Sequence, residues 1–396
     1  MNLIDIPIKK SFFFKNGHRA LNNRAISAEI FYPESLRSLA PSLRALVNRY
    51  LQKIKKEVES LAGEEGVAEL DLQPRTMELF SEIVGLTLFG EKMPKVEGKP
   101  ISTLIEEVAN GYFKNNTSLL HFFSGGVTTK LGLSPLFNEL EKSRRKIYQK
   151  IEKVVKERSS QGYQRGLNVI DLIITKNEQL QSEGRTEEVL TMEEIVDTII
   201  VVIFAGVDTT RSLTQFAINH LSKDLQLQDL VRATVKNEIF DTSSQDDYDA
   251  YASCKILNNF IKEALRLYSP VWLGVMRRAT KDFKLGQFEI GKGSVLTVVF
   301  ASLHQNPNDF DDPLKFDLGR YEDESKVREL SKSALIPFST GKRACIGRNL
   351  GDLTFKLILA EFVQIFDIFE ASGTKNCGIA SFTYGLDKCD IKLRCR

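Results

Sequence analysis

One cysteine near the C-terminal end of the chain is surrounded by residue types that suit a reactive thiolate. Cys345 lies in the run FSTGKRACIG, in which Gly341 and Gly347 let the backbone fold tightly around the sulfur and bring N–H donors close. Arg343 adds positive charge and can bind a carboxylate through two hydrogen bonds. Phe338 can cover the sulfur with an apolar ring. The run indicates a cysteine that is kept as a thiolate; the alternative is an ordinary buried cysteine in a loop that contains glycines.

A second group of residues suited to chemistry is the sequence AGVDTT, residues 205–210, in a predicted long helix. Ala205 and Gly206 leave space beside the helix, where a flat ligand could pack closely. Thr209 can hydrogen-bond to a carbonyl one turn earlier and loosen the helix there. Such an opening would admit water beside the Asp208 carboxyl and a hydroxyl, as proton delivery requires. The alternative is a buried helix with a tolerated glycine and a polar turn.

A third pair, Glu263 and Arg266, lies between these two motifs in the sequence. A spacing of three residues places both side chains on one face of a helix. Such pairs are common on protein surfaces and contribute little there, so the pair carries little information alone.

These three motifs, in this order, resemble the haem-ligand loop, the oxygen-binding helix and the Glu-x-x-Arg pair of the cytochrome P450 family. The resemblance implies haem b with Cys345 as its axial thiolate ligand, in a loop that also includes Phe338, Gly341, Arg343 and Gly347. It further implies that O2 binds on the opposite face, against Ala205 and Gly206. Asp208 and Thr209 would then relay protons to it.

The resemblance also assigns further arginines. Arg24, in NGHRALNNRAISAEI, and either Arg277 or Arg278 would bind haem propionates, and we favour Arg277. Ala20 stands where the family has an aromatic residue before the first of these arginines. Arg320, in FDLGRY, would be the third member of a buried network with the Glu-x-x-Arg pair that holds the haem-ligand region. His304 also fits the family's pattern, in a structural role.

Composition fits a large globular enzyme. The chain has 396 residues, of which 42% are hydrophobic and 27% charged. A net charge of +2 favours neither nucleic acid nor an acidic polymer as partner. Five widely spaced cysteines indicate reduced thiols rather than a disulfide framework. No segment is long and apolar enough to span a bilayer, and the N-terminus lacks the order of a signal peptide.

Hydrophobic periodicity predicts a mainly α protein with small β-sheets. We expect helices over residues 33–61, 70–90 and 140–158, a long helix after Thr191, and loops over 112–135 and 176–191. Residues 283–300 alternate as strands do around Gly291-Lys-Gly293, which predicts a β-hairpin there, and the last twenty-five residues suggest another small sheet.

The resemblance covers nearly the whole chain and implies a single cytochrome P450 domain over residues 1–396. It departs at the front, because the family's N-terminal sheet, first helices and any membrane anchor would precede NGHRALNNR, where this chain has few residues. We expect a fragment, an incomplete gene or a truly short protein. The location therefore stays open between the cytoplasm and the surface of the endoplasmic reticulum. The spacing from Thr209 to Cys345 resembles that of the eukaryotic microsomal type, and of a few similar bacterial enzymes, more than that of compact bacterial members of the family.

The resemblance implies a haem-dependent monooxygenase that inserts one oxygen atom of O2 into an apolar organic substrate. Its electrons would come from a flavin reductase or a ferredoxin, with Lys342, Arg348 and Arg19 as candidate docking cations. Two alternatives stay open. One is a haem-thiolate isomerase or dehydratase, whose family members often lose the acid–threonine pair that is intact here. The other is a non-catalytic, truncated haem-binding remnant.

Overall fold

The computed structural model describes residues 10–116, 134–160, 166–241, 246–373, 376–380 and 383–396. The helices are α1 (His18–Ala28), α2 (Pro33–Leu61), α3 (Leu72–Phe89), α4 (Ile101–Asn116), α7 (Pro135–Ser160), α8 (Val169–Ser182), α9 (Met192–Leu221), α10 (Leu225–Val235), α11 (Asp247–Ser253), α12 (Lys255–Tyr268), α13 (Phe300–His304), α14 (Glu324–Ser333) and α15 (Arg348–Ile365). The strands are β1 (Val67–Asp71), β2 (Lys95–Val96), β3 (Lys99–Pro100), β4 (Arg277–Arg278), β5 (Phe283–Leu285), β6 (Phe288–Ile290), β7 (Val295–Leu296), β8 (Phe366–Glu370), β9 (Gly378–Ala380), β10 (Tyr384–Leu386) and β11 (Asp390–Cys395). The predicted class, mainly α with small sheets, is confirmed.

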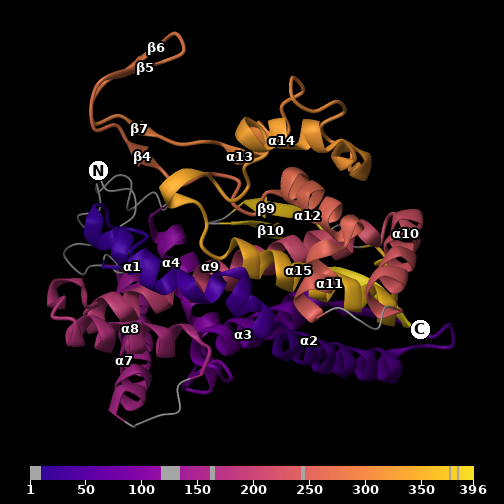
Figure 1. Cartoon of the computed structure of the whole chain (residues 1–396). Helices are drawn as coiled ribbons and strands as arrows, with labels where there is room; N and C mark the ends of the chain where they lie inside the picture. Colours follow the sequence, from indigo (N-terminus) through magenta and orange to yellow (C-terminus); the bar gives the residue numbers. More distant parts are fainter. Residues whose placement is uncertain (1–9, 117–133, 161–165, 242–245, 374–375, 381–382) are drawn as a thin grey trace.

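Helix α9 runs through the middle of the molecule, and α3, α12 and α15 pack against it (Figure 1). It begins with a capping box, in which the Thr191 hydroxyl accepts from the Glu194 N–H at 3.3 Å. In return, the Glu194 carboxylate accepts from the Thr191 N–H at 2.9 Å. This reciprocal pair satisfies two backbone donors that a helix start leaves free. The long helix predicted after Thr191 is therefore confirmed.

The other predicted helices are present with shifted ends. Helix α2 has the predicted bounds, begins with Pro33 in its first turn and buries Leu36, Leu43 and Val47 completely. The helix expected over 70–90 begins at Leu72, because the two residues before it belong to β1. The helix expected over 140–158 extends to 135–160 as α7.

Both predicted loops are partly wrong. Residues 112–116 belong to α4, and residues 117–133 lie outside the described part of the chain. Residues 176–182 continue α8, because Ile173, Ile174 and Leu180 bury one face of an otherwise polar helix. Among the described residues, no helix combines the length and the hydropathy that crossing a membrane requires.

The predicted hairpin is present, but its turn lies earlier than expected. Strands β5 and β6 pair antiparallel and turn at Gly286, whose φ of 58° favours glycine. Gly291 and Gly293 instead follow the second strand, and the Gly293 N–H donates to the Ala279 carbonyl at 2.8 Å. At the base, β4 pairs with β7, Arg277 opposite Leu296. The hairpin projects away from the helices (Figure 1).

The C-terminal segment is built of strands, as predicted, but they belong to two small sheets rather than one. Strand β11 lies between β1 and β8 in a three-stranded antiparallel sheet. Strands β9 and β10 pair with each other, and β10 packs against α9. This contact brings Thr383 and Tyr384, from the end of the chain, beside the central helix.

Candidate active site

The predicted haem-ligand loop is a tight turn that leads into α15. The Cys345 N–H donates to the Phe338 carbonyl at 2.8 Å, and the Ala344 N–H donates to the Gly341 carbonyl at 3.0 Å. Gly341 has φ 69°, a left-handed conformation that favours glycine. Gly347 has an ordinary φ of −83°, and a Cβ there would lie 3.9 Å from the Cys345 sulfur. The backbone angle therefore requires glycine at the first position only.

The Cys345 side chain reaches solvent, although protein atoms surround its thiol closely. Burial raises the pKa of this thiol. The backbone N–H groups of Gly347 and Arg348 and the positive charges of Arg24 and Arg348 oppose that rise. These are the donors and cations that stabilise a thiolate. A thiol with such surroundings suits a metal ligand.

Three arginines predicted to bind propionates lie near this loop. The Arg343 guanidinium donates to the carbonyls of Phe12 at 2.8 Å and Phe13 at 2.7 Å. Arg24, on α1, donates to the Ala344 carbonyl beside the cysteine. Burial lowers the pKa of Arg343, and the nearby charges of Arg277 and Arg24 lower it further.

The partners of these arginines fit an anionic ligand. Among the described residues, Arg24, Arg277 and Arg343 hydrogen-bond only to backbone carbonyls and form no ion pair. Arg278 donates to the Gly293 carbonyl instead, and its charge is not among those that act on Arg343. Mutually repelling cations beside a cysteine match the two propionates and the iron of haem. This donor set fits the cofactor and favours Arg277 over Arg278.

Helix α9 exposes one residue of the predicted oxygen-binding motif to solvent. Ala205 is exposed, although Ile203 and Val207 on either side are buried. The Thr209 hydroxyl donates to the Ala205 carbonyl at 2.8 Å, as predicted. The helix continues without a break, so the expected loosening is not observed.

Gly206 has a different role from the one expected. A Cβ at this position would lie 3.2 Å from Cγ2 of Val84, on α3. That distance is tighter than ordinary van der Waals contact. The missing side chain therefore lets α3 approach α9 closely, rather than leaving open space for a flat ligand.

Asp208 is half-buried and has two partners that the sequence did not reveal. Its Oδ1 accepts from Nη2 of Arg211 at 2.9 Å, and its Oδ2 accepts from the Thr383 hydroxyl. Arg211 also binds Glu106 of α4 at 2.7 Å. The spacing of three residues on one helix could have indicated Arg211. Thr383, the other partner of Asp208, and Glu106, which binds Arg211, are each more than one hundred residues away in the sequence.

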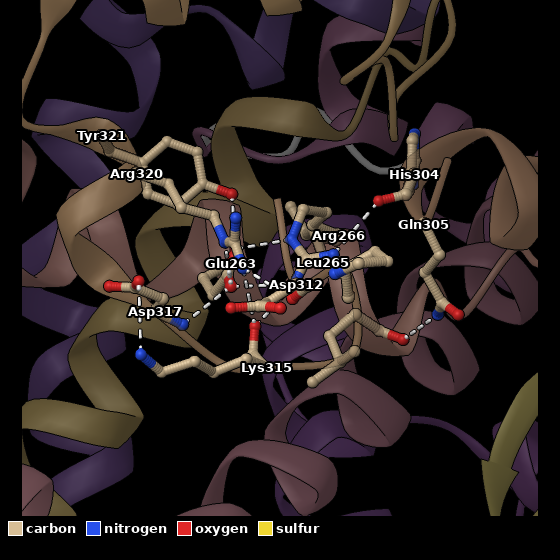
Figure 2. A network of polar contacts seen from close by, with 12 residues as sticks. Glu263, Leu265, Arg266, His304, Gln305, Asp312, Lys315, Asp317, Arg320 and Tyr321 are labelled. Carbon is tan, nitrogen blue, oxygen red and sulfur yellow. Dashed lines mark hydrogen bonds and ion pairs between the residues drawn. The ribbon is translucent and has the colours of Figure 1, made fainter. Parts of the chain in front are cut away.

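Glu263 and Arg266 form a buried ion pair, and both side chains are 0% exposed (Figure 2). Two guanidinium nitrogens of Arg266 donate to the two carboxylate oxygens, at 2.7 and 2.8 Å. Arg320 donates to the same carboxylate at 3.2 Å, as predicted, and the Tyr321 hydroxyl donates to it at 2.7 Å. The pair is therefore part of an internal network and not a surface pair.

The network also holds the backbone of the segment that precedes the haem-ligand loop. Arg266 donates to the carbonyls of His304 at 3.2 Å and Lys315 at 3.0 Å, and its guanidinium lies 5.2 Å from the centre of the Phe310 ring. The Asp317 N–H donates to Glu263 at 2.8 Å. Since every partner belongs to the segment that runs from the last residue of α13 to the start of α14, the network fixes how that segment lies against α12.

Arg19 does not fit the predicted docking role. Its guanidinium pairs with the buried Glu194 carboxylate and also donates to the carbonyls of Glu187 and Val189. The residue thus ties α1 to the beginning of α9. Lys342 and Arg348, in contrast, are exposed beside the cysteine.

The family model for cytochrome P450 matches residues 2–386. The chain belongs to the cytochrome P450 family. Cytochromes P450 are haem-thiolate oxidoreductases, and their haem b has a cysteine as axial ligand.

Relatives with curated descriptions come from several kingdoms. Cytochrome P450 CYP72A219 of Panax ginseng is 26% identical over 359 residues, which cover 88% of this chain and 66% of that protein. Cytochrome P450 6a8 of Drosophila melanogaster is 25% identical over 382 residues, covering 94% and 73%. The cyclooctat-9-en-7-ol 5-monooxygenase of Streptomyces melanosporofaciens is 26% identical over 306 residues, covering 77% and 63%. The chain thus spans about two thirds of the length of these relatives.

Solved structures share the fold. The crystal structure of the cytochrome P450DA heme domain matches with a TM-score of 0.81 at 19% identity, over 100% of this chain and 83% of that chain. The retinoic acid-bound cyanobacterial CYP120A1 matches with a TM-score of 0.80 at 21% identity, over 98% and 81%. The predicted cytochrome P450 fold is therefore confirmed.

Proposed function

We propose that the chain provides the catalytic part of a haem-dependent monooxygenase, which inserts one oxygen atom of O2 into an apolar organic substrate. The observation that supports this most is the position of Cys345, an exposed residue, beside three arginines that lack carboxylate partners among the described residues. Helix α15, which follows the cysteine, packs against α9, and a Cβ on Gly351 would lie 3.7 Å from the Thr210 hydroxyl. These contacts support the proposal that the ligand loop and the acid–threonine pair, next to Thr210, act in one site.

Haem, when bound, supplies the redox and oxygen chemistry, and the chain's own residues hold it and control water and protons. Cys345 would bind the iron, and Arg24, Arg277 and Arg343 would bind the propionates. Phe338, half-buried, would shield the sulfur from water.

Proton delivery favours a monooxygenase over an isomerase or dehydratase. Reducing O2 to water and an inserted oxygen atom consumes two protons, whereas rearranging a peroxide consumes none. Asp208 and Thr209 lie next to the exposed Ala205, and the Asp208 carboxyl is hydrogen-bonded on both oxygens. A held carboxyl and a hydroxyl beside an exposed position of the helix are suited to passing protons inward.

Electrons would enter on the side of the cysteine loop. Lys342 and Arg348 are exposed there, and an acidic flavin reductase or ferredoxin would be attracted to them. The Arg348 guanidinium also lies 5.6 Å from the centre of the Phe338 ring, and its charge acts on the cysteine thiol. Lys342 is therefore the better docking candidate of the two.

The deciding experiment is the carbon monoxide difference spectrum of the reduced protein. The wild type should show the band of a haem with a thiolate ligand, and Cys345→Ser should lose it, because an alcohol stays protonated and is a poor iron ligand. Cys377→Ser is the matched control, since Cys377 is also free and exposed. A normal band in Cys345→Ser would overturn the proposal, as would a wild type that binds no haem.

A further inference from the structure

Two carboxylates from different helices share one nitrogen of Arg211. Its Nη2 lies 2.9 Å from Oδ1 of Asp208, one turn earlier on α9, and 2.7 Å from Oε1 of Glu106, on α4. Its Nη1 donates to the side-chain oxygen of Gln73 at 3.0 Å. Thus one guanidinium joins the predicted proton-relay acid to an acid on another helix.

The group is well shielded from solvent, so these charges interact strongly. The side chains of Arg211 and Asp208 are each 13% exposed, and that of Glu106 is 25% exposed. One positive charge faces two negative charges, and screening by salt is weak at such depth. Burial raises the pKa of Glu106, the Asp208 charge raises it further, and Arg211 opposes both effects.

Arg211 also has hydrogen-bonding capacity that these contacts do not use. Its Nε is buried and has no hydrogen-bond partner among the described residues. A guanidinium with an unused donor can rotate toward one acid or the other without losing all of its bonds. Thr383 holds the second oxygen of Asp208 from the β9–β10 hairpin. The carboxyl of Asp208 is thus held from two sides.

We propose that Arg211 is a positioning residue for the proton relay, and that Glu106 sets how tightly Arg211 holds Asp208. This inference rests on the monooxygenase function proposed above. While Glu106 shares the guanidinium, Arg211 holds the Asp208 carboxyl less tightly, and that carboxyl can move as the relay requires. Without Glu106, the guanidinium would pair with Asp208 alone and fix its carboxyl in place.

The first test is Glu106→Gln, an isosteric change that removes only the charge. Slower proton delivery should divert O2 to hydrogen peroxide, since O2 with two electrons and two protons leaves as H2O2. We expect the share of electrons recovered as peroxide to rise at least about twofold, with a larger solvent deuterium isotope effect on product formation. The matched control is Glu107→Gln, because Glu107 is the next residue and pairs with Lys99 at the surface.

A merely structural role for Glu106 would give a different result. Glu106→Gln would then lower the unfolding midpoint and leave both the peroxide share and the isotope effect at the wild-type values. That outcome, or equal effects in Glu106→Gln and Glu107→Gln, would overturn the inference.

The second test needs no turnover. Urea unfolding of the purified protein would be measured for Glu106→Gln, Asp208→Asn and the double variant. If both acids share Arg211, the two effects should be non-additive, and the non-additivity should change when Arg211→Gln is present in all the proteins, because only the direct repulsion between the two carboxylates then remains. Additive effects in the wild-type background would contradict the shared contact.

Failure of the inference can be told from failure of the proposed function. A wild type with the thiolate carbon monoxide band and a hydroxylated product, combined with an unaffected Glu106→Gln, would refute the role of Glu106 alone. A wild type without that band would refute the function itself.

Discussion

The imidazole Nε2 of His304 accepts a hydrogen bond of 3.2 Å from the backbone N–H of Ile336, two residues before Phe338. Because Nε2 accepts, the ring proton lies on Nδ1, which donates to the Ser269 hydroxyl at 2.9 Å. The His304 carbonyl in turn accepts from Arg266. One buried, neutral histidine therefore connects the Glu263 network to the start of the haem-ligand loop.

This histidine should make stability depend on pH. Burial lowers the pKa of His304 to about 4, from an ordinary value of 6.5, with a further contribution from the Arg266 charge. The unfolded chain binds the proton more readily, so the contribution is fully present above about pH 6.5 and is lost as pH falls toward 4. The loss could reach about 3 kcal/mol.

Urea unfolding of wild type and His304→Gln at pH 7.5 and pH 4.5 would check this. The variant should be less stable at the higher pH and should lose less stability on acidification. His220→Gln is a useful control, since burial lowers the pKa of His220 too, without a bond to this loop. Equal acid-induced losses in wild type and His304→Gln would contradict the assignment.

Breaking the buried network should be costly. Glu263→Gln would leave Arg266 and Arg320 facing each other without their shared counter-charge, and we expect a loss of about 3–5 kcal/mol in the free energy of unfolding. Glu329→Gln is the control, because Glu329 pairs with Lys332 at the surface and is 73% exposed. That change should cost less than about 1 kcal/mol. Similar denaturation midpoints for the two variants would argue against a stabilising network.

Removing the Thr209 hydroxyl should uncouple the reaction. In Thr209→Ala we expect haem binding to persist, while the yield of product per electron falls and peroxide rises. Thr214→Ala removes the same kind of helix bond one turn further on, where the hydroxyl donates to the Thr210 carbonyl at 2.9 Å. The measurement is product and peroxide formed per reductant consumed. An unchanged ratio in Thr209→Ala would exclude this hydroxyl from the relay.

Reversing the charge at Lys342 should slow the first electron transfer from an acidic partner. The effect should be largest at low salt, because the Debye length falls from about 10 Å at 0.1 M to about 3 Å at 1 M. Stopped-flow reduction of wild type and Lys342→Glu across ionic strength would show it. Lys153→Glu, on the exposed side of α7, is the control. If Lys342→Glu accepts electrons at the wild-type rate at low salt, the partner docks elsewhere.

Local patterns predicted the local structure, and they worked best where one face is buried. The repeat of apolar residues gave α2 with its bounds, because Leu36 and Leu43 pack into the core. Polar composition misled at residues 176–182, since α8 needs only a narrow apolar face. The hairpin turn was misplaced because Gly286 and Gly291 both suit a turn, and only strand pairing decides between them.

The site residues also fall into those that local patterns predict and those that only the folded structure brings together. Cys345 and Arg343, or Asp208 and Thr209, are neighbours in the sequence, so residue type and spacing were sufficient to find them. Glu106, by contrast, lies on α4 and contacts Arg211 of α9 only in the folded protein, so residue type and spacing did not reveal it. Arg19 was predicted to be available for docking, but in the folded protein it pairs with Glu194. Contacts between distant segments are the part that a single sequence does not contain.

The arginines around Cys345 repel one another in the folded protein. Arg24 and Arg277 disfavour the charge on Arg343, and only carbonyl dipoles partly relieve the repulsion. If the protein folds before haem binds, it must hold these like charges close together. Anions from the solvent would then reduce the repulsion between them. Chloride and haem would thus have one effect in common, because each would reduce the electrostatic repulsion among these arginines. The protein without haem should therefore become less stable on dilution into low-salt buffer, whereas the stability of the protein with bound haem should not change.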